Sequence, residues 1–168
     1  MRKLIRKPTY DVNDRPFMII WETTHACDLA CRHCRAEAIP DHDPLSLNFE
    51  EAKQLLDQVE SFGKPRPIFI FTGGDPFKRA DLFELLQYGQ ELGLAMAVSP
   101  SGTPLLNEEN LRKVKENGAK AISLSIDGST PERHDDFRQV PGSFDLTTRG
   151  WKTARELGLK LQLNTTVT

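Results

Sequence analysis

Cysteine is scarce in this sequence and confined to one place. Only three cysteines occur among the 168 residues, and all of them lie between positions 27 and 34. An odd number of cysteines argues against a framework of disulfide bonds. The sequence also shows no signal peptide and no apolar stretch approaching the ~20 residues that a membrane span needs. We therefore expect a soluble cytoplasmic protein with no membrane partner.

A surplus of charge of one sign is missing as well. The chain carries 22 basic and 24 acidic residues, a formal net charge of -2, which predicts no nucleic-acid partner. We expect the basic segment from Met1 to Lys7 to be a solvated tail. The length and a hydrophobic content of 38% suit one domain with its own core. The expected division is an N-terminal extension over residues 1–16 and a single domain over residues 17–168.

The cysteines that are present, Cys27, Cys31 and Cys34, follow the spacing C-x3-C-x2-C on one short segment. Three thiolates can bind three irons of a cubane iron–sulfur cluster, because each iron normally takes one cysteine. Since the sequence has no fourth cysteine, the fourth iron would stay open to a substrate or cofactor. The pattern predicts a 4Fe-4S cluster with one open iron.

A zinc site is the main alternative for these cysteines. Sites with three cysteines and one histidine are common, and His25, His33 and His42 lie close by in the sequence. Zinc ligands usually come as two pairs from separate segments, whereas these cysteines form a single cluster. This difference favours the iron–sulfur cluster.

Apolar runs of strand length alternate along the chain with segments of helix length. We expect strands over 17–21, 68–71, 94–98, 121–126 and 159–167, and helices over 48–62, 81–92, 108–117 and 143–157. Asn107 and either Ser46 or Asn48 are the expected helix N-caps. The alternation predicts an α/β fold of βαβ units with a parallel sheet and right-handed crossovers. It leaves two arrangements open, a doubly wound sheet and a TIM-like partial barrel.

Candidate motifs follow four of the predicted strands. The cysteine segment comes after the first strand, and the next three strands are followed by residues 72–76, 99–103 and 127–128. Both possible arrangements bind ligands at the carboxyl ends of their strands. We therefore expect these motifs to meet at one rim of the sheet.

The cysteine run and the Trp21-Glu22 segment that precedes it resemble the signature of the radical S-adenosylmethionine (SAM) enzymes. In that family, the amino and carboxylate groups of SAM chelate the open iron. Gly73-Gly74-Asp75-Pro76 looks like the family's G-G-E-P motif, whose backbone receives the amino group of SAM. The resemblance implies that Gly73, Gly74 and Asp75 bind the cofactor, with Asp75 one methylene shorter than the usual glutamate.

Two later segments resemble the S-L-D-G and H-D-x-F-R motifs of family members that carry a SPASM or twitch domain, residues 123–128 and 130–138. The resemblance implies that Ser125 and Arg138 help to hold the ribose and the carboxylate of SAM. A guanidinium suits a carboxylate in both geometry and charge. The alternative is that Arg138 forms a surface ion pair with Asp135 or Asp136.

Four further residues are candidates on the same resemblance. His33 stands just before the last cysteine, where the family usually has an aromatic residue whose ring shields the cluster and whose carbonyl reads the adenine amino group. Ser99 and Ser101 occupy the place of a turn that relatives use near SAM. Asn164, near the end of the fifth predicted strand, is the weakest of the four.

The resemblance as a whole implies a radical SAM core, a TIM-like partial barrel that lacks its last unit. The general likeness is to haem-maturation members, including alternative haem synthases, and to peptide-modifying SPASM proteins. The implied enzyme uses a 4Fe-4S cluster to cleave SAM reductively, and the resulting 5′-deoxyadenosyl radical abstracts hydrogen from a peptide or tetrapyrrole-type substrate. It would be oxygen-sensitive and would take electrons from a donor such as flavodoxin or ferredoxin.

The length of the chain and the function class leave two questions open. Cores of this kind resemble six βα units followed by an auxiliary cluster domain, whereas this sequence ends at its fifth predicted strand. We expect a fragment, or a short homologue that is completed by a partner or a second copy of itself. The alternative function is a non-catalytic Fe–S or zinc-binding module or a scaffold partner.

Overall fold

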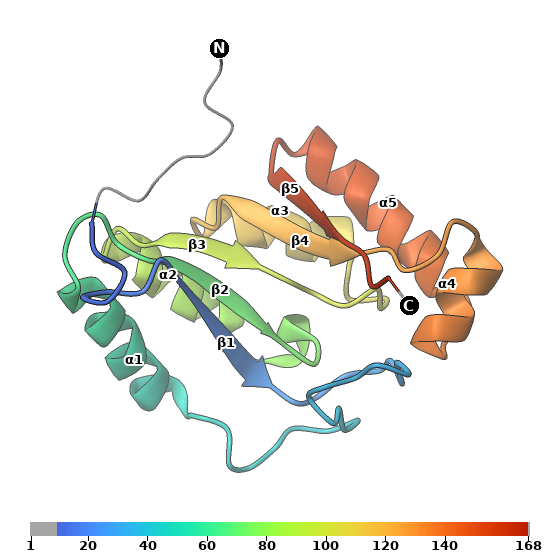
Figure 1. The fold of residues 1–168 in the computed structure, drawn as a ribbon, viewed down its shortest axis with the longest axis horizontal. Helices are drawn as coiled ribbons and strands as arrows, with labels where there is room; N and C mark the ends of the chain where they lie inside the picture. The colour runs from blue at the N-terminus through green and yellow to red at the C-terminus, as the bar shows by residue number, and fades with distance from the viewer. Residues whose placement is uncertain (1–9, 168) are drawn as a thin grey trace.

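The computed structural model describes residues 10–167 as a parallel sheet of five strands connected by helices (Figure 1). The strands are β1 (Met18–Thr24), β2 (Ile68–Gly73), β3 (Ala95–Val98), β4 (Ala121–Ser125) and β5 (Lys160–Asn164). The α-helices are α1 (Phe49–Ser61), α2 (Leu82–Glu91), α3 (Glu108–Glu116), α4 (Pro131–Arg138) and α5 (Ser143–Glu156), and a short 3-10 turn, η1, covers Pro76–Lys78. The predicted tail from Met1 to Lys7 lies outside the described residues.

The strand order decides between the two arrangements that the sequence leaves open. The strands lie side by side in the order β1-β2-β3-β4-β5, and every neighbouring pair is parallel. A doubly wound sheet reverses its order at a switch point, whereas a barrel adds each new strand on the same side. The sheet is therefore part of a barrel-type α/β core, and its strand ends form the expected rim (Figure 1).

The helix boundaries follow from local capping. Asn48 begins α1 with a capping box, in which its side chain accepts from the Glu51 N–H at 3.0 Å and Glu51 accepts from the Asn48 N–H at 2.8 Å. Asn107 caps α3 by accepting from the Asn110 N–H at 3.0 Å. Both predicted caps are confirmed, and Asn48 rather than Ser46 serves α1.

The structure adds α4 and η1, which the sequence periodicity does not predict. Only His134 of α4 is buried, so this helix lacks the apolar stripe that identifies an amphipathic helix. A local signal was present, because Thr130 accepts from the Arg133 N–H at 3.4 Å and Pro131 stands at the first turn. The fifth strand is also shorter than predicted, since it ends at Asn164 rather than at residue 167.

The hydrophobic core lies between the sheet and the helices. Phe69 and Phe71 of β2 are fully buried in a cluster that includes Leu56 of α1 and Leu86 of α2. A second cluster joins β4 to α3 and α5 through Ile122, Leu124, Leu111 and Ala154. Because side chains alternate along a strand, the other face of the sheet carries Met18 and Ile20 of β1, which are 39% and 59% exposed.

No helix within residues 10–167 is both long enough and apolar enough to span a membrane.

Candidate cofactor site

A cavity of about 440 Å³ lies at the carboxyl ends of the strands. It brings together residues that are distant in the sequence, and most of the predicted site residues line it: Cys27, Cys31, Cys34, His33, Gly73, Gly74, Ser125 and Arg138. Ser101 and Thr72 line it as well. Ser99 and Asn164 instead line an adjoining cavity of about 300 Å³, and Ser125 and Gly73 belong to both cavities.

The cysteine segment is held by backbone hydrogen bonds on its two sides. Where the segment leaves β1, the Cys27 N–H donates to the Ile39 carbonyl at 2.8 Å. Near the second cysteine, the Ala30 and Arg32 N–H groups donate to the carbonyls of Arg138 and Phe137 at 3.3 and 3.1 Å. The last carbonyls of a helix have no partner within the helix. The last carbonyls of α4 therefore accept their hydrogen bonds from the cysteine segment.

The three cysteines are free and differ in burial. Cys27 is buried, Cys31 is half-buried and Cys34 is exposed. Burial raises the pKa of the Cys27 thiol, although the Ser101 hydroxyl and the Leu29 N–H oppose this shift. A buried thiol with a raised pKa is disfavoured as a free thiolate, so a bound cation would be needed to hold it deprotonated.

The spread of the donors bears on the zinc alternative. Within residues 10–167, no three His, Cys, Asp or Glu side chains gather closely enough to hold a single metal ion. A zinc ion needs its sulfur and nitrogen ligands within about 2.0–2.3 Å of one centre. Thiolates that each bind a different iron of a cluster do not converge on one point. Three thiols around one open cavity are a donor set that fits an iron–sulfur cluster.

The glycine turn after β2 packs against the segment that leads into the cysteines. The Gly74 and Asp75 N–H groups donate to the carbonyls of Thr24 and Ala26, both at 2.7 Å. A Cβ atom on Gly73 would collide with the Thr24 carbonyl, and one on Gly74 would collide with the Ala26 carbonyl. Gly73 also has a φ of 121°, which favours glycine. The close approach that requires these glycines is thus to the chain itself.

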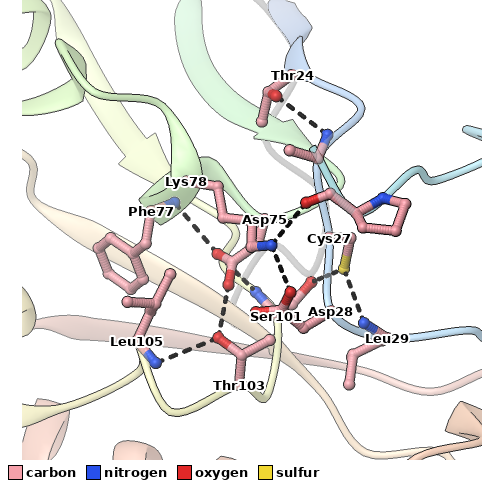
Figure 2. A network of polar contacts seen from close by, with 12 residues as sticks. Thr24, Cys27, Asp28, Leu29, Asp75, Phe77, Lys78, Ser101, Thr103 and Leu105 are labelled. Carbon is pink, nitrogen blue, oxygen red and sulfur yellow. Dashed lines mark hydrogen bonds and ion pairs between the residues drawn. The ribbon is translucent and has the colours of Figure 1, made fainter. Parts of the chain in front are cut away.

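The Asp75 side chain points away from the cavity. Its carboxylate is buried, accepts from the Thr103 hydroxyl at 2.6 Å and from the Phe77 N–H at 3.2 Å, and lies 3.5 Å from the Ser101 N–H (Figure 2). The Asp75 carboxylate therefore joins the turn after β2 to the loop after β3 by hydrogen bonds.

Arg138 has a different ion-pair partner from those that the sequence suggests. Its guanidinium pairs with Asp127, whose side chain is 1% exposed, and donates to Cys31 Sγ at 3.5 Å. Burial raises the pKa of Asp127, but the Thr166 N–H and the Arg138 guanidinium outweigh this effect and bring the pKa below its usual range. Asp127 is thus a charged partner that the sequence analysis missed, although its place at the end of β4 was recognised.

The surface ion pair suggested for Arg138 is wrong. Asp135 accepts from the Gly142 and Phe144 N–H groups at 2.6 and 2.8 Å, at the start of α5. Asp136 pairs with Arg32 of the cysteine segment at 2.5 Å. Both carboxylates are therefore engaged away from Arg138.

The His33 ring stacks on Phe137 of α4, with centroids 4.5 Å apart and planes 19° apart. Burial lowers the pKa of His33, and the positive charge of Arg138 lowers it further. A neutral imidazole stacked on an aromatic ring acts as a flat apolar wall at the edge of the cavity. The His33 ring therefore lies at the cavity edge with one face covered by Phe137.

Comparisons with known proteins find sequence relatives along most of the chain. The family model for the Radical SAM superfamily matches residues 21–168. The chain is 48% identical to the AdoMet-dependent heme synthase of Oleidesulfovibrio alaskensis, over 90% of this chain and 38% of that protein. It is 30% identical to the mycofactocin maturase MftC of Mycobacterium tuberculosis strain H37Rv, over 86% of this chain and 36% of that protein. The chain therefore spans less than half the length of these relatives.

The fold matches solved structures of low sequence identity. A structure described as native anSMEcpe with bound AdoMet superposes with a TM-score of 0.69 at 19% identity. The match covers 86% of this chain and 42% of that one. At this identity the match shows the fold alone.

We predict that the stability of the protein falls with rising pH because of Asp75. Burial raises the pKa of this carboxyl, and the Thr103 and Phe77 hydrogen bonds only partly oppose it. A folded state that binds the proton more tightly loses stability as the pH rises from the unfolded-state pKa through the raised one. Wild type should therefore lose free energy of unfolding relative to Asp75→Asn across this window, measured by anaerobic urea unfolding. Asp41→Asn, at an exposed position, controls for net charge, and pH curves that stay parallel would refute the assignment.

Proposed function

The chain belongs to the radical SAM superfamily, and we propose that it forms the cofactor-binding part of an enzyme that modifies a tetrapyrrole. Members of this family use a 4Fe-4S cluster and SAM. One observation carries the proposal for this chain: three cysteine thiols and the guanidinium of Arg138 line a single cavity at the strand ends. When bound, the cluster and SAM together supply a 5′-deoxyadenosyl radical for abstraction of a hydrogen atom.

Different residues around the cavity would bind the cluster and the separate polar groups of SAM. Cys27, Cys31 and Cys34 would hold the cluster. The backbone of Gly73 and Gly74 borders the cavity beside the cysteines, where carbonyl oxygens accept hydrogen bonds from an ammonium group. These assignments match the polar groups of SAM to the polar groups of the cavity wall.

Arg138 would hold the carboxylate of SAM. Its side chain lines the cavity, and the contacts to Cys31 and Asp127 use only two of the five N–H donors of a guanidinium. The Asp127 pair fixes the side chain, which is only 13% exposed. A fixed and shielded guanidinium loses little side-chain entropy when a carboxylate binds. Ser125, which lines both cavities, would contact the ribose.

The adjoining cavity of about 300 Å³ would admit the substrate beside SAM. We favour a tetrapyrrole over a peptide because the chain is 48% identical to a heme synthase and 30% identical to a peptide maturase. Hydrogen abstraction from a peptide remains the second candidate, since that maturase matches over 86% of the chain. We further propose a cytoplasmic location, sensitivity to oxygen, and electron supply from flavodoxin or ferredoxin.

Loss of one cysteine should abolish both the cluster and the chemistry. Cys34 is exposed, so Cys34→Ala removes a proposed ligand without opening the core. After anaerobic reconstitution, we expect the variant to lose the iron of the cluster and to form no 5′-deoxyadenosine from SAM with dithionite as reductant. Leu45→Ala, a matched change at an exposed position, should keep both properties. Zinc in the wild type, or iron without cleavage of SAM, would instead support a non-catalytic module.

Replacement of Arg138 by lysine should weaken SAM binding. A hydrogen bond to a charged group contributes about 1.5–3 kcal/mol, and lysine keeps the charge but loses the planar fork. We expect the dissociation constant of SAM to rise about tenfold or more, measured by anaerobic calorimetry on protein with intact iron content. Arg133→Lys, an exposed position on the same helix, is the control. An unchanged affinity in Arg138→Lys would remove this residue from the SAM site.

A further inference from the structure

Ser101 joins the cysteine segment to the glycine turn. Its hydroxyl oxygen lies 3.4 Å from Cys27 Sγ and 2.8 Å from the Gly74 carbonyl oxygen. Thr103, two residues further along the same loop, donates to the buried carboxylate of Asp75 (Figure 2). The loop is thus anchored beside both motifs, and the Ser101 hydroxyl lies between the Cys27 sulfur and the Gly74 carbonyl oxygen.

The hydroxyl can satisfy only one of these acceptors at a time. A serine hydroxyl carries one proton. A sulfur that binds iron has no proton to give, so in the loaded protein Cys27 can only accept, as the Gly74 carbonyl does. The proton therefore points to whichever acceptor is the stronger, and a change in either acceptor moves it.

Ser101 is the rotatable donor among those that contact the cysteine sulfurs. Cys27 also receives the Leu29 N–H at 3.4 Å, but that donor belongs to the backbone and cannot turn. Cys31 receives the Arg138 guanidinium, which is fixed by its pairing with Asp127. A response of the hydrogen bonding to the charge on the sulfurs is therefore expected at Cys27, through Ser101.

We propose that Ser101 is a positioning residue that couples reduction of the cluster to the binding of an ammonium group at the Gly74 carbonyl. This inference rests on the proposed function. Reduction of a bound cluster by a low-potential electron donor would add negative charge to its sulfur ligands, and hydrogen bonds to sulfur would stabilise that charge. The hydroxyl then turns toward Cys27 and away from Gly74.

The consequence at Gly74 is a stronger acceptor. A carbonyl oxygen has two lone pairs, but a donor on one of them weakens its attraction for a second donor. When the Ser101 hydroxyl turns away, this oxygen can accept a hydrogen bond from the amino group of SAM. That bond is charge-assisted. No covalent bond forms or breaks in this step, and the proton stays on the Ser101 oxygen throughout.

Coupling of this kind is reciprocal. If reduction strengthens the binding of SAM, then the binding of SAM must favour reduction by the same free energy. Part of the change in midpoint potential that SAM causes therefore depends on the Ser101 hydroxyl. Removal of the hydroxyl should make this change less positive, and a hydroxyl on a different side chain should restore it.

The test compares the midpoint potential of the cluster with and without SAM, by anaerobic redox titration followed by electron paramagnetic resonance. We expect the change caused by SAM to be less positive in Ser101→Ala than in wild type and to be restored in Ser101→Thr. Ser61→Ala removes a serine hydroxyl bond at the far end of α1, to the Gln58 carbonyl, and should behave as wild type. An identical change in wild type and Ser101→Ala would overturn the inference.

Two further outcomes separate this inference from the proposed function. Wild-type protein that binds no cluster, or that binds no SAM, would overturn both. If Ser101→Ala holds no cluster, the test uses the wild-type protein alone. The inference then requires that SAM binds the reduced protein more tightly than the oxidised protein. Equal affinities of the two forms would overturn the coupling and leave the cofactor assignment intact.

Discussion

The site depends on two backbone hydrogen bonds that join the ends of β1 and β2. They run from the Gly74 and Asp75 N–H groups to the carbonyls of Thr24 and Ala26, and they leave no room for a Cβ atom on either glycine of the turn. Because Ala26 directly precedes Cys27, this contact fixes the start of the cysteine segment against the turn after β2. The cysteines and the glycine turn thus border one cavity although about 40 residues separate them.

A second support comes from the opposite side of the cavity. The terminal carbonyls of α4 receive the Ala30 and Arg32 N–H groups, and Arg138 reaches Cys31 from the same helix end. Only His134 of this helix is buried, and the contacts with the cysteine segment add to those that Asp135 and His134 make with the start of α5. Binding of a cluster would therefore stabilise α4, because a ligand that binds only the folded arrangement stabilises it by mass action.

The sequence predicted the alternation of strands and helices, since βαβ units carry clear periodicity and their caps are local. It also located the rim, because the carboxyl ends of parallel strands must meet. The sequence did not predict the contacts that depend on tertiary structure. The Asp75 carboxylate turns beneath the rim to Thr103, and Arg138 selects Asp127 rather than its sequence neighbours. Neither choice has a local pattern, and α4 itself was missed because it has no apolar stripe.

The most direct test of the site is electron–nuclear double resonance on the reduced wild-type protein with SAM labelled by ¹⁵N in its amino group and ¹⁷O in its carboxylate. If the three cysteines hold a cluster with one open iron, both labels should show hyperfine coupling to the cluster, because both atoms would bind that iron. A SAM-binding protein that holds its iron with neither coupling would contradict an open iron in this cavity.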